Sequence, residues 1–229
     1  MSIGTGKTEL EAGIKLFRNE NYKEAIDSLE KTFESKNDIE SGYHLALAYA
    51  QIQNYDKTLE IFDKIMRRLD NPLRIMQAHI IVGYIYAIKE MYDLAEFELL
   101  DALASGIENT QIHSVLGYIY YKKNNTRKAI DSLRKAVAMD SQSANARNSL
   151  GFILADSGIN IEEGISEIKK ALNMDPKNPA YLDSLGWAFF KKNDIASAKE
   201  FLTKAFEIAP TNKDIKEHLI KLDQLGYKK

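Results

Sequence analysis

The chain has 229 residues, of which 45% are hydrophobic and 28% charged, so its composition is that of a folded protein and excludes wholesale disorder. Its 31 basic and 33 acidic residues give a net charge of −2, which supplies no general attraction to nucleic acid or to an anionic membrane. The absence of cysteine excludes disulfide scaffolds, thiolate zinc sites and cysteine nucleophiles.

Residues 1–5 are predicted to form a polar leader. The stretch Met1–Glu11 has no apolar core of the kind a signal peptide needs, and no apolar run in the chain reaches the ~18 residues that cross a bilayer. We therefore expect no direct membrane insertion. Two locations stay open, because the chain is either cytoplasmic as given or the mature part of an exported protein or lipoprotein.

A small residue recurs along the chain within an apolar context. Its positions are 13, 46, 83, 117, 151 and 186, with successive gaps of 33, 37, 34, 34 and 35 residues. We call these positions the anchors. All are glycine except Ala46, and most follow a large apolar residue, as in Leu116-Gly117 and Leu185-Gly186. A self-similar period of this length is typical of stacked helical repeats.

A second set of marks follows each anchor at fixed offsets. A small residue comes about twelve residues later and a larger apolar residue about four residues after that, as in Ala129 and Leu133 or Ala198 and Leu202. Apolar positions three and four apart predict two amphipathic helices per period. Asn124-Asn125 and Asn193-Asp194 separate these helices, and asparagine tolerates the left-handed conformation that ends a helix.

Glycine within a helix costs about 1 kcal/mol relative to alanine, so its recurrence needs a compensating contact. We expect the paired helix to approach closely at each anchor, with the recurring alanine as the small facing residue.

These residues closely resemble the tetratricopeptide repeat, a 34-residue helix-turn-helix unit. The best matching stretch carries Leu185, Gly186, Phe189, Ala198 and Leu202, followed by Ala205 and Pro210. The family's tryptophan near the start of its first helix is absent throughout. The resemblance, of the bacterial type, implies an all-α fold, a right-handed superhelical solenoid of antiparallel helix pairs.

Six units are predicted within residues 6–212, at about 6–38, 39–72, 73–109, 110–143, 144–178 and 179–212. The 37-residue gap predicts a lengthened second helix or a longer loop around Arg67–Arg74. One extra residue is expected near Ser157–Asn160 in the fifth unit. Residues 213–229 are predicted to form a capping helix and tail, with Ile215, Leu219, Leu222 and Leu225 on its apolar side.

The resemblance also implies a binding surface, because the first helix of each unit lines the concave face in this family. Residues one and four after the anchor then point into the groove, together with residues one turn earlier. The candidate partner-binding residues are Tyr43, Leu47, Tyr84, Tyr118, Tyr121, Asn148, Phe152, Asp183, Trp187 and Phe190. A stripe of aromatic side chains on a surface is typical of a partner site.

The sequence therefore predicts a non-enzymatic scaffold that binds a protein or peptide segment in this groove, within an envelope, secretion or regulatory assembly as bacterial members do. The C-terminal half is expected to grip an extended peptide, while the N-terminal half takes an apolar helix or associates with another copy. Two alternatives remain, a helical-repeat RNA-binding protein and a non-catalytic subunit of an enzyme complex. The groove positions are mainly neutral or acidic, which disfavours RNA.

Motifs for catalysis or cofactor binding are not found in the sequence. Gly4-Thr5-Gly6-Lys7 is similar to the end of a phosphate-binding loop, but the motif's first glycine is missing, since Met1 stands there. The four histidines lack the partners of a metal site. We therefore expect no enzyme activity, no cofactor, no metal and no nucleic-acid partner.

Overall fold

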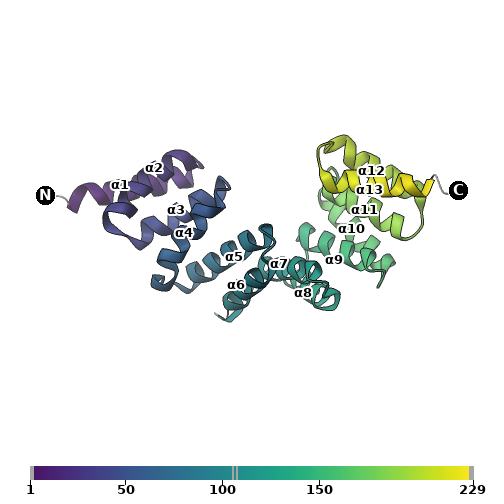
Figure 1. The fold of residues 1–229 in the computed structure, drawn as a ribbon, viewed down its shortest axis with the longest axis horizontal. Coiled ribbons are helices and arrows are strands. Elements are labelled where there is room, and N and C mark those ends of the chain that lie inside the picture. The colour runs from purple at the N-terminus through teal and green to yellow at the C-terminus, as the bar shows by residue number, and fades with distance from the viewer. Residues whose placement is uncertain (1–2, 105, 107, 227–229) are drawn as a thin grey trace. The chain divides into compact units, whose positions relative to one another are not determined.

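The computed structural model describes residues 3–104, 106 and 108–226, and these residues form α helices joined by short turns (Figure 1). Met1 and Ser2 of the predicted leader and residues 227–229 of the predicted tail lie outside the described residues. In chain order the helices are α1 (Ile3–Arg18), α2 (Tyr22–Lys36), α3 (Ile39–Gln51), α4 (Tyr55–Ile65), α5 (Pro72–Ile88), α6 (Tyr92–Ala104), α7 (Thr110–Lys122), α8 (Thr126–Met139), α9 (Ala144–Asp156), α10 (Ile161–Met174), α11 (Pro179–Lys191), α12 (Ile195–Ile208) and α13 (Lys213–Gly226).

Consecutive helices pair as the periodicity predicts, and the all-α solenoid class is confirmed. Each predicted unit contains one pair, such as α7 with α8 within 110–143, and α13 follows as the predicted terminal helix. Helix α1 begins at Ile3, so helical backbone extends into the segment predicted as a polar leader. The count of six repeats and their boundaries stay predictions.

The chain divides into two compact units, an N-terminal unit of residues 1–108 and a C-terminal unit of residues 109–229. In the N-terminal unit, Leu29, Phe62 and Ile65 belong to one core that joins the helices from α1 to α5. In the C-terminal unit, Ile168 and Leu185 pack between α10 and α11, and Leu202 packs against Leu222 of α13. Each unit therefore has its own buried apolar interior.

The turn within most pairs uses a residue in the left-handed conformation. Asn124 has φ 58° and Asn193 has φ 66°, as the sequence predicted. Gly158, with φ 72°, lies in the four-residue connection between α9 and α10, where the sequence placed an extra residue. Glycine and asparagine adopt this conformation at the lowest cost, so these turns are favoured locally.

The extra residues between the second and third units lie around Arg67–Arg74, as the sequence predicted, and they form a longer connection rather than a lengthened second helix. Helix α4 is short, with 11 residues, and a 3-10 turn over Met66–Arg68 follows it. Helix α5 is long, with 17 residues, and Pro72 stands in its first turn, where a missing N–H costs nothing. The extra length is therefore in the 3-10 turn and in the first helix of the third pair.

The recurring glycines allow close approach of the paired helix, as expected, but the residue that faces them differs between pairs. A methyl group added to Gly117 would lie 2.5 Å from Cγ of Leu133, and one added to Gly186 would lie 2.7 Å from Cγ of Leu202. A leucine of the second helix thus fills the space that the missing side chain leaves. Gly117 and Gly186 therefore pack against a large side chain, whereas Gly151 faces the small residue Gly164, whose carbonyl oxygen would lie 2.5 Å from an added methyl group.

Side-chain caps begin most of the second helices in each pair. Asn54, Asn125, Asn160 and Asp194 each accept a hydrogen bond from the backbone N–H three residues later. Met91 occupies the corresponding position before α6 and is 45% exposed. A methionine side chain has no oxygen to accept such a bond, so α6 begins without the side-chain cap that α4, α8, α10 and α12 have.

Replacing Met91 with asparagine is expected to raise the free energy of unfolding of the N-terminal unit by about 1 kcal/mol, because a side-chain cap satisfies an N–H of the first turn. Chemical denaturation followed by circular dichroism measures this change. The reverse substitution, Asn125→Met, is expected to destabilise the C-terminal unit by a similar amount. An unchanged or lowered midpoint for Met91→Asn would contradict the prediction.

Candidate partner-binding face

The predicted site residues divide between the two units. Tyr43, Leu47 and Tyr84 belong to the N-terminal unit, and the other seven lie on α7, α9 and α11 of the C-terminal unit. Tyr43 and Leu47 are buried, whereas the Tyr84 side chain is 48% exposed. The N-terminal unit therefore presents one exposed ring of the predicted stripe.

Exposure also varies among the seven residues of the C-terminal unit. Tyr118 is 43% exposed, while Trp187 and Asp183 are 7% exposed. Four more are half-buried, namely Tyr121, Asn148, Phe152 and Phe190. The sequence predicted a continuous stripe of exposed rings. In the structure, side-chain exposure instead differs along the face, because Tyr118 is exposed and Trp187 is buried.

Asp156, at the end of α9, joins three consecutive first helices. Its Oδ2 accepts a hydrogen bond of 2.5 Å from the Tyr121 hydroxyl on α7, and its Oδ1 accepts one of 2.8 Å from Nε1 of Trp187 on α11. Lys191 Nζ lies 3.4 Å from the same Oδ1. A half-buried carboxylate with these donors holds both aromatic side chains in fixed positions.

These contacts shift the pKa values of the groups involved. Burial alone raises the pKa of Asp156, but the bonds from Tyr121 and Trp187, with the charge of Lys191, outweigh it, so the pKa lies below its ordinary value. Burial, followed by the bond to the carboxylate, raises the pKa of Tyr121. The carboxylate is therefore ionised and the phenol neutral at neutral pH.

His218 of α13 covers the part of this face around Trp187. Its ring stacks on Trp187 with centroids 4.2 Å apart, and its Nδ1 lies 2.9 Å from Oδ1 of Asp183. The opposite end of the aromatic row is less enclosed, where Tyr121 and Phe152 meet edge to face with centroids 6.0 Å apart. The terminal helix thus covers Trp187, which explains its burial.

Sequence periodicity placed Asp156 beside the rings of this groove but missed His218, although a signal exists. The pairs Tyr121–Asp156 and Asp183–His218 are each separated by 35 residues, which is one repeat period. Tyr43 and Gln77 are 34 residues apart and are joined by a hydrogen bond of 2.7 Å. Complementary polar residues one period apart on first helices therefore indicate a contact between neighbouring repeats.

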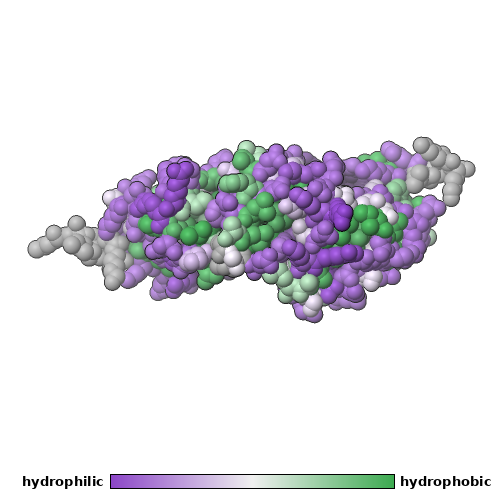
Figure 2. All heavy atoms as spheres, turned by 90° about the horizontal axis from the view of Figure 1, so that it is seen from below, coloured by the Kyte–Doolittle hydropathy of each residue, from purple (hydrophilic) through white to green (hydrophobic). Residues whose placement is uncertain are grey.

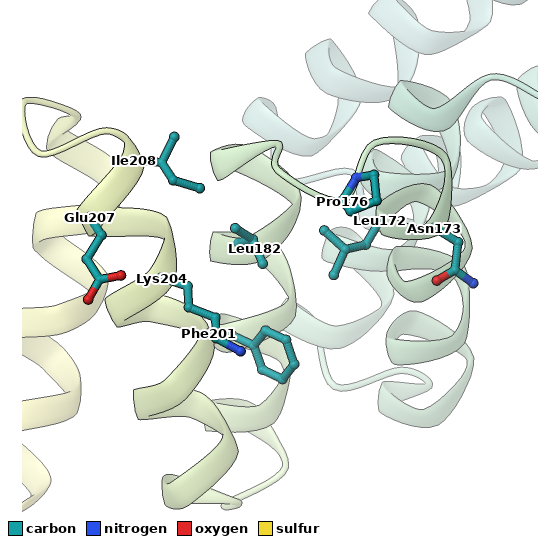
Figure 3. Close-up of a pocket in the computed structure, with 8 residues that line it drawn as sticks. All are labelled: Leu172, Asn173, Pro176, Leu182, Phe201, Lys204, Glu207 and Ile208. Atoms are coloured by element: carbon teal, nitrogen blue, oxygen red, sulfur yellow. The ribbon is translucent and has the colours of Figure 1, made fainter.

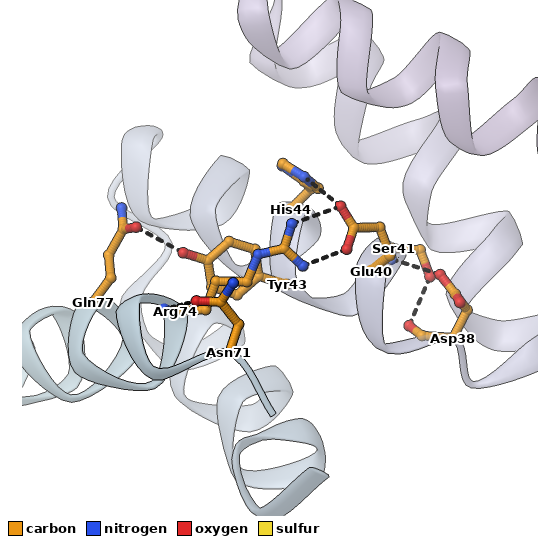
Figure 4. A network of polar contacts seen from close by, with 8 residues as sticks. All are labelled: Asp38, Glu40, Ser41, Tyr43, His44, Asn71, Arg74 and Gln77. Carbon is orange, nitrogen blue, oxygen red and sulfur yellow. Dashed lines mark hydrogen bonds and ion pairs between the residues drawn. The ribbon is translucent and has the colours of Figure 1, made fainter. Parts of the chain in front are cut away.

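In the N-terminal unit, a polar network joins α3 to α5 (Figure 4). Arg74 forms a two-pronged ion pair with Glu40, in which Nη2 lies 2.9 Å from Oε1, and its guanidinium lies 4.9 Å from the Tyr43 ring centroid. Nε2 of His44 lies 3.2 Å from the same carboxylate. Apart from Nδ1 of His44, which is buried and has no hydrogen-bond partner among the described residues, these groups pair with one another, so the network links neighbouring repeats.

An open cleft of about 450 Å³ lies between α10, α11 and α12 (Figure 3). Leu172, Leu182, Phe201 and Ile208 supply its apolar lining, and Lys204 and Glu207 lie at its edge. This lining lacks the carboxylate pair or nucleophile–base pair that hydrolytic chemistry needs.

No group of three or more metal-ligating side chains occurs among the described residues. Within the same part of the chain, no helix is long and apolar enough to cross a membrane.

Similar sequences are found among repeat proteins. The chain is 34% identical over 80 residues to the TPR repeat-containing protein PA4667 of Pseudomonas aeruginosa, which is 35% of this chain. The matched region spans only 13% of that relative's length.

Similar solved structures cover most of the chain. YrrB, described as a TPR protein with an unusual peptide-binding site, is 25% identical with a TM-score of 0.60, covering 82% of this chain and 96% of YrrB. PilW, a type IV pilus biogenesis factor, is 14% identical with a TM-score of 0.74, covering 95% of this chain and 100% of PilW. At that identity, PilW supports the fold alone.

Family models match two parts of the C-terminal unit. Residues 117–158 match a model described as TPR repeat, and residues 180–212 match one described as tetratricopeptide repeat. Proteins with these repeats generally mediate protein–protein interactions and are typically non-catalytic. Together with the helix pairs and the solenoid neighbours, these matches support a tetratricopeptide repeat protein, with family repeats located at residues 117–158 and 180–212.

Proposed function

We propose that this protein is a non-enzymatic scaffold that holds an extended peptide segment of a partner protein on the α7–α9–α11 face of its C-terminal unit. The observation that carries the proposal is the row of Tyr118, Tyr121 and Phe152, in which one ring is 43% exposed and two are half-buried. Partly exposed aromatic side chains on a rigid support are frequent anchors of binding energy.

Polar groups beside this row suit a peptide backbone. Asn145 and Asn148 lie on α9, and the buried Oδ1 of Asn148 has no hydrogen-bond partner among the described residues. A buried acceptor without a partner is rare and costs free energy, and a small rotation of the amide would let it accept from a peptide N–H. An asparagine contact to backbone groups is independent of the peptide's side chains.

The similarity to YrrB supports a peptide as the ligand, since that protein is described as having a peptide-binding site and nearly its whole length is covered. The ionised Asp156 and the buried Asp183 on α9 and α11 disfavour RNA, because a phosphate backbone would meet carboxylates there. Self-association through the N-terminal half stays a prediction.

The test selects binding peptides from a random library displayed on phage, using the wild-type protein, and measures their affinity by fluorescence anisotropy. Tyr118→Ala and Phe152→Ala are expected to weaken the selected peptides at least tenfold, as expected for the loss of an aromatic anchor. Asn148→Ala is expected to weaken them less, because one hydrogen bond is lost.

A matched control is Ile159→Ala, since Ile159 lies in the same unit, is 60% exposed and is outside the face. Trp187 is unsuitable as a binding probe because it is buried and its loss would disturb packing. Retained affinity in Tyr118→Ala and Phe152→Ala, with unchanged circular dichroism, would show that peptides bind elsewhere.

A further inference from the structure

Helix α6 carries exposed apolar side chains where the other second helices carry polar ones. Leu94, Phe97 and Leu100 are 43%, 59% and 45% exposed, and they lie 11, 14 and 17 residues after the anchor Gly83. The corresponding positions are occupied by Lys57, Glu60 and Asp63 in α4 and by Lys128, Asp131 and Arg134 in α8. The same offsets give Glu24, Asp27 and Glu30 in α2 and Ser197, Glu200 and Thr203 in α12. In α10, where one extra residue shifts the register, the corresponding residues are Glu163, Ser166 and Lys169.

This difference is confined to one helix within the repeat register. Spacing of three residues places Leu94, Phe97 and Leu100 next to one another along α6. Figure 2 shows hydrophobic side chains gathered on the mostly hydrophilic surface in the region of α5 and α6. Met91, the exposed residue that replaces the capping asparagine, extends the apolar character to the start of α6. Contiguous exposed apolar surface of this kind marks an interaction site.

The acidic residues around the apolar side chains of α6 restrict the charge of the partner. Helix α6 contains four acidic residues, Asp93, Glu96, Glu98 and Asp101, and no basic residue. Asp93 and Asp101 lie four residues before and four residues after Phe97, so a carboxylate stands one turn on either side of the central ring. Eight residues of helix separate these two carboxylates by about 12 Å.

From these observations we propose that the α6 face docks a basic amphipathic helix of another protein, independently of the peptide face described above. The apolar side of that helix packs on Leu94, Phe97 and Leu100, because ridges of side chains on one helix fit the grooves of another. Its lysine or arginine side chains, two turns apart, meet Asp93 and Asp101. A second copy of α6 would bring another Asp93 and another Asp101 to the same place, and an anionic membrane is repelled for the same reason.

The test uses three synthetic 18-residue peptides labelled with fluorescein. One has a leucine and phenylalanine face with lysine elsewhere, the second replaces every lysine with glutamate, and the third scrambles the lysine peptide. We expect the lysine peptide to bind the wild-type protein at least tenfold tighter than either of the others. The triple variant Leu94→Lys, Phe97→Glu, Leu100→Asp, which copies the α4 face, is expected to lose at least tenfold in affinity.

Two further variants test the contribution of charge and the independence of the α6 face from the peptide face. Asp101→Asn is expected to weaken the lysine peptide about threefold and to reduce the dependence of its affinity on salt. Tyr118→Ala is expected to leave that affinity unchanged, so failure of one proposed site does not imply failure of the other. The triple substitution uses residues already exposed on α4, so circular dichroism is expected to remain that of the wild type.

Several results would overturn the proposal. Equal affinity for the lysine and glutamate peptides would show that the carboxylates of α6 do not select a basic partner. Full retention of binding by the triple variant would show that the peptide binds at another site. A wild-type dimer in sedimentation that the triple variant abolishes would assign the face to a second copy of the chain. Binding to neutral phosphatidylcholine vesicles without binding to the lysine peptide would assign it to lipid.

Discussion

Replacing Gly151 with alanine is expected to lower the free energy of unfolding of the C-terminal unit by about 2–3 kcal/mol. The added methyl group would lie 2.5 Å from the carbonyl oxygen of Gly164 and 2.7 Å from Cγ1 of Ile168. Because one of the contacts is with backbone, α9 and α10 must separate, and this cost exceeds the gain of about 1 kcal/mol in helix propensity. Urea denaturation followed by the emission of Trp187, the single tryptophan, measures the change.

Two substitutions serve as comparisons for this prediction. Gly117→Ala is expected to cost less, because its methyl group meets the side chain of Leu133, which can shift. A methyl group added to Gly158 would have no neighbour within 4 Å. Gly158→Ala is therefore expected to lower the free energy of unfolding by about 1 kcal/mol, because this residue has a positive φ. If Gly151→Ala proved no more destabilising than Gly158→Ala, close approach of the helices would not explain the regular spacing of small residues along this chain.

Replacing Asp156 with alanine is expected to destabilise the C-terminal unit by about 2–3 kcal/mol, since the Tyr121 hydroxyl and the Trp187 indole lose a charged acceptor. Equilibrium denaturation measures the loss, and the Trp187 emission of the native state is expected to change. Asp156→Asn is expected to have a smaller effect, because the amide keeps one acceptor oxygen.

The effect of Asp156 is expected to depend on pH. Its pKa is lowered in the folded state, so its contribution to stability is fully present above the ordinary carboxyl pKa and is lost as pH falls through the lowered value. The difference in stability between wild type and Asp156→Asn is therefore expected to shrink below about pH 4. A difference that stays constant down to about pH 2 would show that the charge of Asp156 contributes nothing.

The helices and their turns could be predicted from the sequence because each depends on neighbours within one period. Apolar spacing gives the amphipathic helices, and Asn124 and Asn193 mark turns that need a left-handed residue. A small facing residue was predicted correctly for Gly151, which meets Gly164, but wrongly for Gly117 and Gly186, because spacing reveals which residues are small but not which side chain fills the gap. In the structure Leu133 and Leu202 do so.

Exposure within the candidate site could not be predicted from position alone. Tyr84, Tyr118 and Trp187 all follow an anchor glycine directly, yet they are 48%, 43% and 7% exposed. Trp187 differs because His218 stacks on it and Asp156 binds its indole N–H. Those partners lie on other helices, so the degree of burial depends on tertiary contacts that repeat register does not specify.

The terminal helix α13 has a consequence for lengthening the array. It meets α11 at a separation of one period through His218 and Asp183, as the first helix of a further pair would, and it buries Ile215 and Leu222. A duplicated pair inserted between Ile208 and Lys213 would therefore find a matching surface on both sides if it kept this register. Growth of the protein by duplication would thus require compatible side chains at only two junctions, without redesign of the existing interior.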